Sequence, residues 1–316
     1  MKSGVILGID TSNYTTSVAL MSQSGELIAN LKRPLPVKAG ERGLRQSDAV
    51  FSHIKNLPDI LKEAKGILDG VGIAAVGVSE RPRNIEGSYM PCFLAGVSAA
   101  ESAALAAHAP LYRFSHQCGH IMAAVYSSGK EELLSKSFAA FHVSGGTTEL
   151  LRVTRDGFAF RAELVGGTAD LNAGQVIDRI GVLMGLPFPA GAHIEALAMK
   201  NTKTIPRKKP PVRDLQVSLS GLENLAERLY RDSGDASLTS AFLLDYIGRA
   251  LLMLTDGYIS EFGSSPVLYA GGVMSNSIIK KMLAVAPDRY FAAPALSSDN
   301  AVGIAALARR AYLSID

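Results

Sequence analysis

Two histidines lie four residues apart near the middle of the chain, at His116 and His120. On a helix, side chains at this spacing share one face and can reach the same metal ion. Imidazole nitrogen suits zinc or iron, but such a site needs a third ligand from elsewhere in the chain. Two histidines that cap or pack at the start of a helix explain the same spacing, so the pair alone leaves both interpretations open.

Glycines and hydroxyls gather in a second segment, Ser144-Gly-Gly-Thr-Thr148, between two runs of β-forming residues. The pattern predicts a hairpin whose tip is bare main chain and small polar groups. Glycine admits close approach and positive φ, so such a tip can present N–H groups to a phosphate. Most Gly-Gly hairpins are only turns, and the segment alone does not choose between a turn and a phosphate site.

The chain opens with a similar strand, turn and strand. Asp10, Thr11 and Ser12 follow a buried apolar run and begin a turn rich in hydroxyls. A carboxylate beside several hydroxyls can hold a metal-bound phosphate, which makes these three residues candidates for a phosphate or metal. The alternative is an Asp/Ser turn that satisfies its own backbone.

The elements that must position these groups occur twice in the same order. Three predicted strands cover residues 4–33 and three more cover residues 137–165, and alternating helices and strands follow each set. This duplication predicts an α/β protein with two similar lobes around a cleft, where small ligands usually bind. We expect the turns near residues 11–16 and 144–148 to face each other across that cleft.

The predicted lobes divide the chain near its first histidine. We expect residues 1–115 and a C-terminal helix over 298–316 to form one lobe, and residues 116–297 the other. In the first lobe a helix is predicted over residues 47–65 with Ser47-Asp48 at its N-cap. Its apolar face is predicted from helical spacing to contain Val50, Ile54, Leu57 and Leu61.

Length and composition favour a soluble, reduced protein. With 316 residues the chain can bury two cores, and its two cysteines cannot form a disulfide framework. Asp10 interrupts the short apolar run at the N-terminus, so we expect no signal peptide, and no apolar run reaches the roughly 20 residues that span a bilayer. We therefore expect a cytoplasmic location and no membrane partner.

Basic residues gather locally although the formal net charge is only +3. Residues 207–213 place four cations around two prolines, and Arg309-Arg310 lies near the C-terminus. A solvated loop is the preferred interpretation of residues 207–213, and a docking patch for RNA or an acidic partner is the alternative.

Eight short motifs in order resemble those of the TsaD/Gcp family of tRNA N6-adenosine threonylcarbamoyltransferases, often labelled glycoproteases. The resemblance extends nearly end to end. The motifs are Gly8-Ile-Asp-Thr-Ser12, His116-x-x-x-His120, Val143-Ser-Gly-Gly-Thr147, Gly174 to Asp178, Pro189-Ala-Gly191, Ser220-Gly-Leu222, Gly271-Gly-Val-x-x-Asn276 and Ser298-Asp-Asn-Ala301. The resemblance implies an actin-like ATPase fold, which is ribonuclease H-like, with two duplicated lobes around a nucleotide cleft.

The resemblance also implies roles for individual residues. His116, His120 and Asp299 would bind a divalent metal, iron or zinc. Asp178 would hold ribose hydroxyls, with Gly191 and Asn276 lining the nucleoside pocket. The residues that would cradle the phosphates of ATP or ADP, or threonylcarbamoyl-AMP, are Val143, Ser144, Gly145, Gly146 and Thr147. The implied partners are tRNA and either pathway proteins or a second copy of the chain.

Several positions depart from the family pattern. Residues 13–16 lack two acids of the first turn, Thr147 replaces a histidine, Leu171 an aspartate and Gln175 a glutamate, and residues 81–87 replace a Gly-Pro-Gly segment. Removing a charge that a reaction uses can cost several kcal/mol of barrier. We therefore expect a divergent member of the family and assign no catalytic residue.

Three functions follow from these observations. The first is transfer of threonylcarbamoyl to tRNA, and the second is a non-catalytic nucleotide- and metal-binding partner or regulator on the same fold. The third is a metallopeptidase, which is least favoured because residues 116–120 lack the glutamate that His-Glu-x-x-His proteases use as general base.

Overall fold

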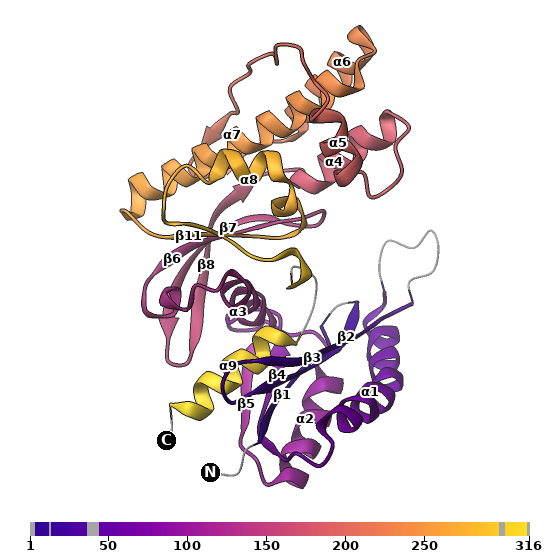
Figure 1. The fold of residues 1–316 in the computed structure, drawn as a ribbon, viewed down its shortest axis with the longest axis vertical. Coiled ribbons are helices and arrows are strands. Elements are labelled where there is room, and N and C mark those ends of the chain that lie inside the picture. Colours follow the sequence, from indigo (N-terminus) through magenta and orange to yellow (C-terminus); the bar gives the residue numbers. More distant parts are fainter. Residues whose placement is uncertain (1–3, 13, 37–43, 297–300, 315–316) are drawn as a thin grey trace. The chain divides into compact units, whose positions relative to one another are not determined.

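The computed structural model describes residues 4–12, 14–36, 44–296 and 301–314 (Figure 1). The chain divides into two compact units. Unit 1 contains residues 1–131, 155–162 and 298–316, and unit 2 contains residues 132–154 and 163–297.

A five-stranded sheet forms the centre of unit 1, in the order β3-β2-β1-β4-β5. β1 pairs antiparallel with β2 and parallel with β4, and every residue of β1 is buried. Burial on both faces is typical of a strand covered by helices on each side. The strands are β1 (Val5–Asp10), β2 (Thr15–Ser22), β3 (Leu27–Pro34), β4 (Ile73–Arg81) and β5 (Leu111–Ser115).

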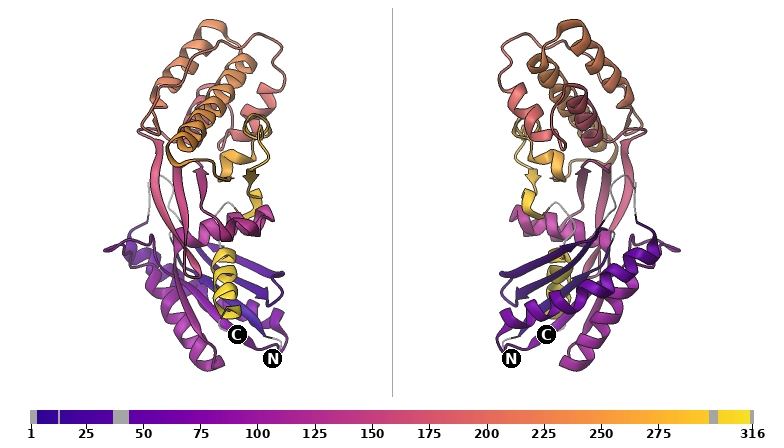
Figure 2. Two further views of the ribbon diagram at one scale, coloured as in Figure 1. Left: turned by 90° about the vertical axis from the view of Figure 1, so that its left-hand side faces the viewer. Right: turned by 90° about the vertical axis from the view of Figure 1, so that its right-hand side faces the viewer.

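Helices cover both faces of this sheet. α1 (Gln46–Leu68) and α2 (Phe93–Ala107) form an apolar core with β1, β2 and β4. α9 (Val302–Leu313) packs on the opposite face, against β1 and β4, and α3 (His116–Ser128) packs on α9 (Figure 2). The close approach of α9 requires glycine, because a Cβ on Gly8 would lie 2.7 Å from the Ala301 carbonyl oxygen.

Unit 2 repeats this topology and extends it. Its seven-stranded sheet has the order β12-β11-β6-β7-β8-β10-β9, and its first five strands match β5-β4-β1-β2-β3 of unit 1 in order. The pairs among β12, β11, β6 and β7 also match in direction. The duplication predicted from the sequence is therefore confirmed. The strands are β6 (Phe138–Val143), β7 (Thr148–Asp156), β8 (Ala159–Thr168), β9 (Val212–Arg213), β10 (Gln216–Val217), β11 (Val267–Ala270) and β12 (Arg289–Phe291).

The core of unit 2 is built around α7 (Ala236–Phe262). α7 is long and apolar enough to cross a bilayer, but 72% of its most apolar window is buried, as in the core helix of a globular unit. Asp235 caps it by accepting from the N–H groups of Ser237 and Leu238. α6 (Ser220–Ser233) runs beside it (Figure 2). The remaining helices are α4 (Ala173–Leu183), α5 (Gly191–Ala198) and α8 (Ser277–Leu283), with a short 3-10 turn, η2 (Gly272–Ser275), before α8.

Three details differ from the sequence predictions. The prediction for the buried face of α1 was partly wrong, because Ile54 is 55% exposed while His53 is fully buried. Arg45 occupies the N-cap position of α1, and Asp48 lies in the first helical turn. α3 falls within unit 1 and not within the second lobe, because Gly119 and Gly303 let it pack directly on α9.

Candidate functional site

The Ser144–Thr148 tip joins β6 to β7, as the sequence predicted. The Ser144 N–H donates to the Thr147 carbonyl at 2.7 Å and closes the turn. The Ser144 hydroxyl oxygen accepts from the N–H groups of Gly146, at 3.3 Å, and Thr147, at 3.1 Å. The Ser144 hydroxyl thus accepts from two main-chain N–H groups at the tip, and its own hydrogen can still be donated to an acceptor such as a phosphate oxygen.

Neither Gly145 nor Gly146 is required by the protein itself. Neither has positive φ, contrary to our expectation, and a Cβ on either would meet nothing within 4 Å. Both residues are exposed. The space beside the tip is therefore open to a ligand that approaches the main chain.

The N-terminus of α4 is hydrogen-bonded to the tip. The Gly174 N–H donates to the Ser144 carbonyl at 3.1 Å, and the Ala173 N–H donates to the Thr148 hydroxyl at 2.9 Å. Gly174 has no room for a side chain, because a Cβ would lie 2.7 Å from the Ser144 carbonyl oxygen. Gly271 also packs closely against the start of the tip, with φ of 103° and an ideal Cβ only 2.2 Å from the Val143 oxygen.

A cavity of about 340 Å³ adjoins the tip within unit 2. Its walls are residues 146–149 of the tip, residues 164–168 at the end of β8, and Asp170, Asn172 and Gln216. It lies beside the carboxyl ends of β6 and β8, and ligands of open α/β sheets bind at the carboxyl ends of strands. The cavity and the glycine tip therefore make one candidate ligand site.

Asp170 fixes one wall of this cavity. Its carboxylate accepts from the Ser218 hydroxyl at 2.5 Å and from the N–H groups of Leu219, at 2.7 Å, and Leu171, at 2.6 Å. Burial opposes ionisation, but the bonds from Ser218, Ser220, Leu219 and Leu171 outweigh it and hold the pKa of Asp170 well below its usual value. Asp170 therefore acts as an ionised anchor for the 218–220 turn, a role that the sequence analysis did not assign.

Asp178 and Gly191 lie close together. One Asp178 carboxylate oxygen accepts from the Ala190 N–H at 2.8 Å, which holds the start of α5 beside α4. Asp178 lies four residues beyond Gly174 on α4, so both are on the helix face that carries the tip. A Cβ on Gly191 would meet no neighbour within 4 Å.

Asn276 caps α8 and is connected to the same group of elements. Its side-chain oxygen accepts from the N–H groups of Ile278 and Ile279, both at 3.1 Å. The adjacent Ser277 donates from its main chain, at 2.8 Å, and hydroxyl, at 2.5 Å, to Glu195 of α5. Asp178, Gly191 and Asn276 thus belong to three elements bridged by hydrogen bonds, and their ribose and nucleoside roles remain predictions.

The predicted metal residues lie in unit 1. His116 opens α3, and its Nδ1 lies 2.7 Å from the Asp10 carboxylate, which is 1% exposed. The other Asp10 oxygen accepts from the Ser12 N–H at 2.7 Å. Burial raises the pKa of Asp10, but the His116 charge and the hydrogen bonds from His116 and Ser12 lower it more, so its net shift is downward.

His116 and His120 form a pair on one face of α3. Their ring centroids are 4.2 Å apart, as their spacing predicted. A carboxylate that bonds Nδ1 is the usual second-sphere partner of a histidine that binds a metal through Nε2. The two imidazoles could therefore supply two of the ligands of a metal ion. Asp299 lies outside the described residues, and no cluster of three metal-binding groups occurs within the part that is described.

Thr11 has a structural function in the first turn. Its hydroxyl donates to the Cys92 carbonyl at 3.0 Å and accepts from the Gly96 N–H at 3.0 Å, so it fastens α2 to the end of β1. The Ser12 hydroxyl is buried and has no partner among the described residues. Asp10 and Thr11 are therefore largely occupied by protein groups, and a role of this turn in phosphate or metal binding remains a prediction.

Comparison with known proteins was made for the whole chain. The family model described as TsaD, tRNA N6-adenosine threonylcarbamoyltransferase, matches residues 41–306. The chain is 28% identical over 309 residues to the tRNA N6-adenosine threonylcarbamoyltransferase of Methanopyrus kandleri, covering 95% of this chain and 86% of that protein. It is 31% identical over 298 residues to that of Streptococcus equi subsp. zooepidemicus, covering 90% and 84%.

Solved structures share the fold at lower identity. HypF of T. kodakarensis aligns with a TM-score of 0.60 and 14% identity, over 99% of this chain and 48% of that chain. The Acidaminococcus fermentans (R)-2-hydroxyglutaryl-CoA dehydratase component A aligns with a TM-score of 0.54 and 14% identity, over 98% and 100%. The ROK hexokinase of Thermus thermophilus gives a TM-score of 0.53 at 14% identity, over 98% and 99%. The predicted actin-like ATPase fold is confirmed.

Proposed function

Because this chain belongs to the family of tRNA N6-adenosine threonylcarbamoyltransferases, we propose that it transfers threonylcarbamoyl from threonylcarbamoyl-AMP to an adenosine of tRNA. The adenosine amine forms a bond to the carbamoyl carbon. The bond from that carbon to the phosphate oxygen breaks, AMP leaves with the electron pair, and the amine loses one proton. The protein must therefore bind a phosphate close to the reacting carbonyl.

The glycine tip is the observation that carries this proposal. Gly145 and Gly146 leave an open approach to main chain that neither packing nor backbone conformation explains. The Ser144 hydroxyl converges there with the N–H groups of Gly146 and Thr147. These two bonds orient the Ser144 hydroxyl, whose own hydrogen can be donated to the departing phosphate, and the geometry is set before the ligand arrives because the N-terminus of α4 is hydrogen-bonded to the tip.

We assign the nucleoside to the elements beside the tip. Asp178 accepts from the Ala190 N–H, next to Gly191, with one carboxylate oxygen and offers the other to ribose hydroxyls. Asn276, at the start of α8, closes the pocket. The bonds from Ala190 to Asp178 and from Ser277 to Glu195 support this assignment, because they join α4, α5 and α8 without a ligand. ATP or ADP would occupy the same pocket.

His116 and His120, with Asp299, would hold a divalent iron or zinc ion. The contact between Asp10 and Nδ1 supports this assignment, since it orients the His116 ring as second-sphere carboxylates do for metal-binding histidines. When bound, the ion supplies Lewis-acid stabilisation of an oxygen. Two positions that carry ionisable groups in the family are Thr147 and Leu171 here, so we assign no general base.

The test incubates the purified protein with radiolabelled threonylcarbamoyl-AMP and an unmodified tRNA transcript, with and without candidate partner proteins. Label in the tRNA is the expected result. Nucleotide binding without label under any pairing favours the second candidate, a non-catalytic partner or regulator, for which the substitutions at Thr147, Leu171 and Gln175 are the supporting observation.

A further inference from the structure

Four cations lie on the loop between α5 and α6, which we call the basic loop (residues 206–213). All four side chains are exposed, and none has an ion-pair partner among the residues that the structure describes. They are Arg207, Lys208, Lys209 and Arg213. Cations nearby in unit 2 do pair, namely Lys203 with Asp235, Arg179 with Glu223, Arg228 with Asp232 and Arg231 with Glu227.

An arginine of the core helix holds the main chain of this loop. Arg249 of α7 donates from Nη1 to the Lys208 carbonyl at 2.6 Å. Asp245, one turn earlier on α7, fixes the guanidinium by accepting from Nε at 2.8 Å. The centre of the basic loop is thus tethered to the core of unit 2, while the Lys208 ammonium stays exposed.

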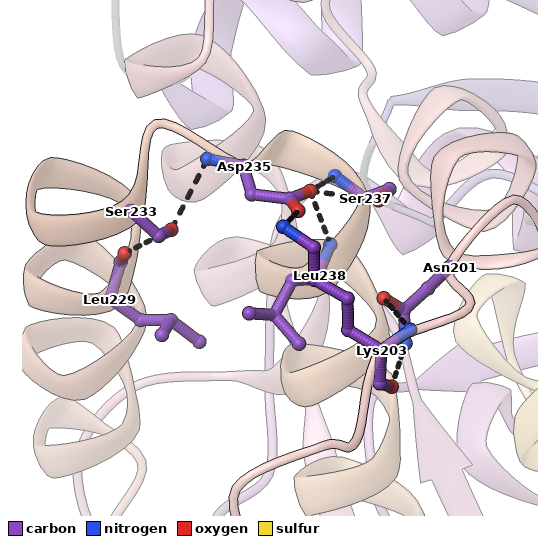
Figure 3. A network of polar contacts seen from close by, with 7 residues as sticks. All are labelled: Asn201, Lys203, Leu229, Ser233, Asp235, Ser237 and Leu238. Carbon is purple, nitrogen blue, oxygen red and sulfur yellow. Dashed lines mark hydrogen bonds and ion pairs between the residues drawn. The ribbon is translucent and has the colours of Figure 1, made fainter.

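The segment that leads into the loop is also fixed (Figure 3). Asn201 bonds the Lys203 main chain at both N–H, 3.2 Å, and carbonyl, 2.8 Å. The Lys203 ammonium lies 2.7 Å from Asp235, whose other oxygen caps α7 through Ser237 and Leu238. The loop therefore starts from the capped end of the core helix.

The far end of the loop reaches the cavity of the candidate site. Pro210 is buried, and Arg213 on β9 is paired with Gln216 on β10. Gln216 pairs in turn with Gly167 of β8, and both line the 340 Å³ cavity. Neighbouring strands lie about 4.8 Å apart, so Arg213 is one strand from the cavity wall.

A tethered, exposed and unpaired set of cations suits a polyanion. Pro206, Pro210 and Pro211 restrict the backbone, which lowers the entropy lost when a ligand orders the loop. Asp214 is the adjacent acid, so residues 207–214 still carry a charge of +3. Lysine and arginine bind phosphate groups as point charges or bidentate forks.

We propose that the basic loop binds the sugar–phosphate backbone of the RNA substrate at the rim of this cavity. The proposal rests on the proposed function for the identity of the RNA. It assigns the loop to phosphate contacts, which position an RNA without reading its sequence.

The test measures binding of an unmodified tRNA transcript over a range of salt concentrations. The variant Arg207→Gln/Lys208→Gln/Lys209→Gln/Arg213→Gln changes the formal charge from +3 to −1. With roughly 0.7–0.9 counterions released per phosphate contact, the slope of log affinity against log salt should shrink by about 3. From about 50 to 200 mM salt the wild type should then lose roughly 50- to 150-fold more affinity than the variant.

A matched control distinguishes the effect of the loop cations from the effect of a lower net charge. Lys55→Gln/Lys62→Gln/Lys65→Gln/Lys136→Gln makes the same change at exposed positions elsewhere, and it should keep the wild-type slope. Arg207→Lys/Arg213→Lys keeps the loop charge and should also bind normally. Equal losses in the loop variant and the control, or an unchanged slope in the loop variant, would overturn the proposal.

Nucleotide binding distinguishes this proposal from the proposed function. The loop variant should bind threonylcarbamoyl-AMP as the wild type does, since the substitutions leave the glycine tip intact. A wild type that binds RNA through the loop but never binds threonylcarbamoyl-AMP would contradict the proposed function and still support the loop. A loop variant that binds tRNA normally but no longer binds an acidic protein partner would overturn the RNA assignment.

Discussion

Acidification should destabilise unit 1 through one buried histidine. His53 on α1 is 0% exposed, and its Nδ1 lies 2.8 Å from the Thr16 hydroxyl. Its Nε2 has no hydrogen-bond partner among the described residues. Burial lowers the pKa of His53 from 6.5 to about 4, although the negative charge of Asp10 opposes this shift.

The size of the effect follows from the two pKa values. Between pH 6.5 and 4 the unfolded chain binds a proton that the folded chain does not, so the free energy of unfolding falls as the pH falls. The contribution of neutral His53 is complete above pH 6.5 and declines by about 1.4 kcal/mol per pH unit within this window. From about pH 7.5 to 5 the expected loss is about 2 kcal/mol.

Urea unfolding at these two pH values, followed by circular dichroism, measures this loss. In His53→Gln the difference between the two free energies should be smaller than in the wild type by about 2 kcal/mol. Replacement of the exposed His193 by Gln serves as the control and should leave the difference unchanged. Equal pH dependence in the wild type and His53→Gln would refute the reasoning, whatever the stability of the variant at neutral pH.

Three further changes test the candidate sites. Gly174→Ala should lower the free energy of unfolding by roughly 1–3 kcal/mol, because the added Cβ collides with the Ser144 carbonyl. The control is Gly221→Ala, where the space is open, and it should change this free energy by less than about 1 kcal/mol. Thermal unfolding compares the two variants. Ser144→Ala should weaken threonylcarbamoyl-AMP binding by roughly tenfold, since a converging hydroxyl is lost, and calorimetry that finds equal affinity would contradict its role. Asp10→Asn should lower metal affinity roughly 10- to 100-fold by releasing His116, and an unchanged affinity in titrations of the purified protein with zinc would count against the carboxylate–histidine arrangement.

Repetition in the sequence predicted most of the architecture. The order of strands and turns appears twice, and a chain of this size that repeats a meander followed by alternating elements has few ways to pack. The helix predicted over residues 47–65 appears as α1, from Gln46 to Leu68. The β9–β10 pair was not predicted, since two-residue strands carry no periodicity.

Contacts between distant residues limited prediction of the sites. The bond between Asp10 and His116 joins residues 106 apart in the chain, and no local pattern signals it. His53 was missed because Val50 and Ile54 offered a more apolar face for α1, while the sheet buries the face that carries His53. Asp170 was not singled out, because its bonds to the 218–220 turn depend on the tertiary fold.

Mass spectrometry of tRNA nucleosides tests the central claim most directly. The wild-type protein, given threonylcarbamoyl-AMP and an unmodified transcript together with its partner proteins, should produce threonylcarbamoyladenosine. The Ser144→Ala variant should produce it more slowly under the same conditions. Complete absence of the modified nucleoside with the wild type, in a preparation shown to bind threonylcarbamoyl-AMP and tRNA, would contradict the assignment as a transferase.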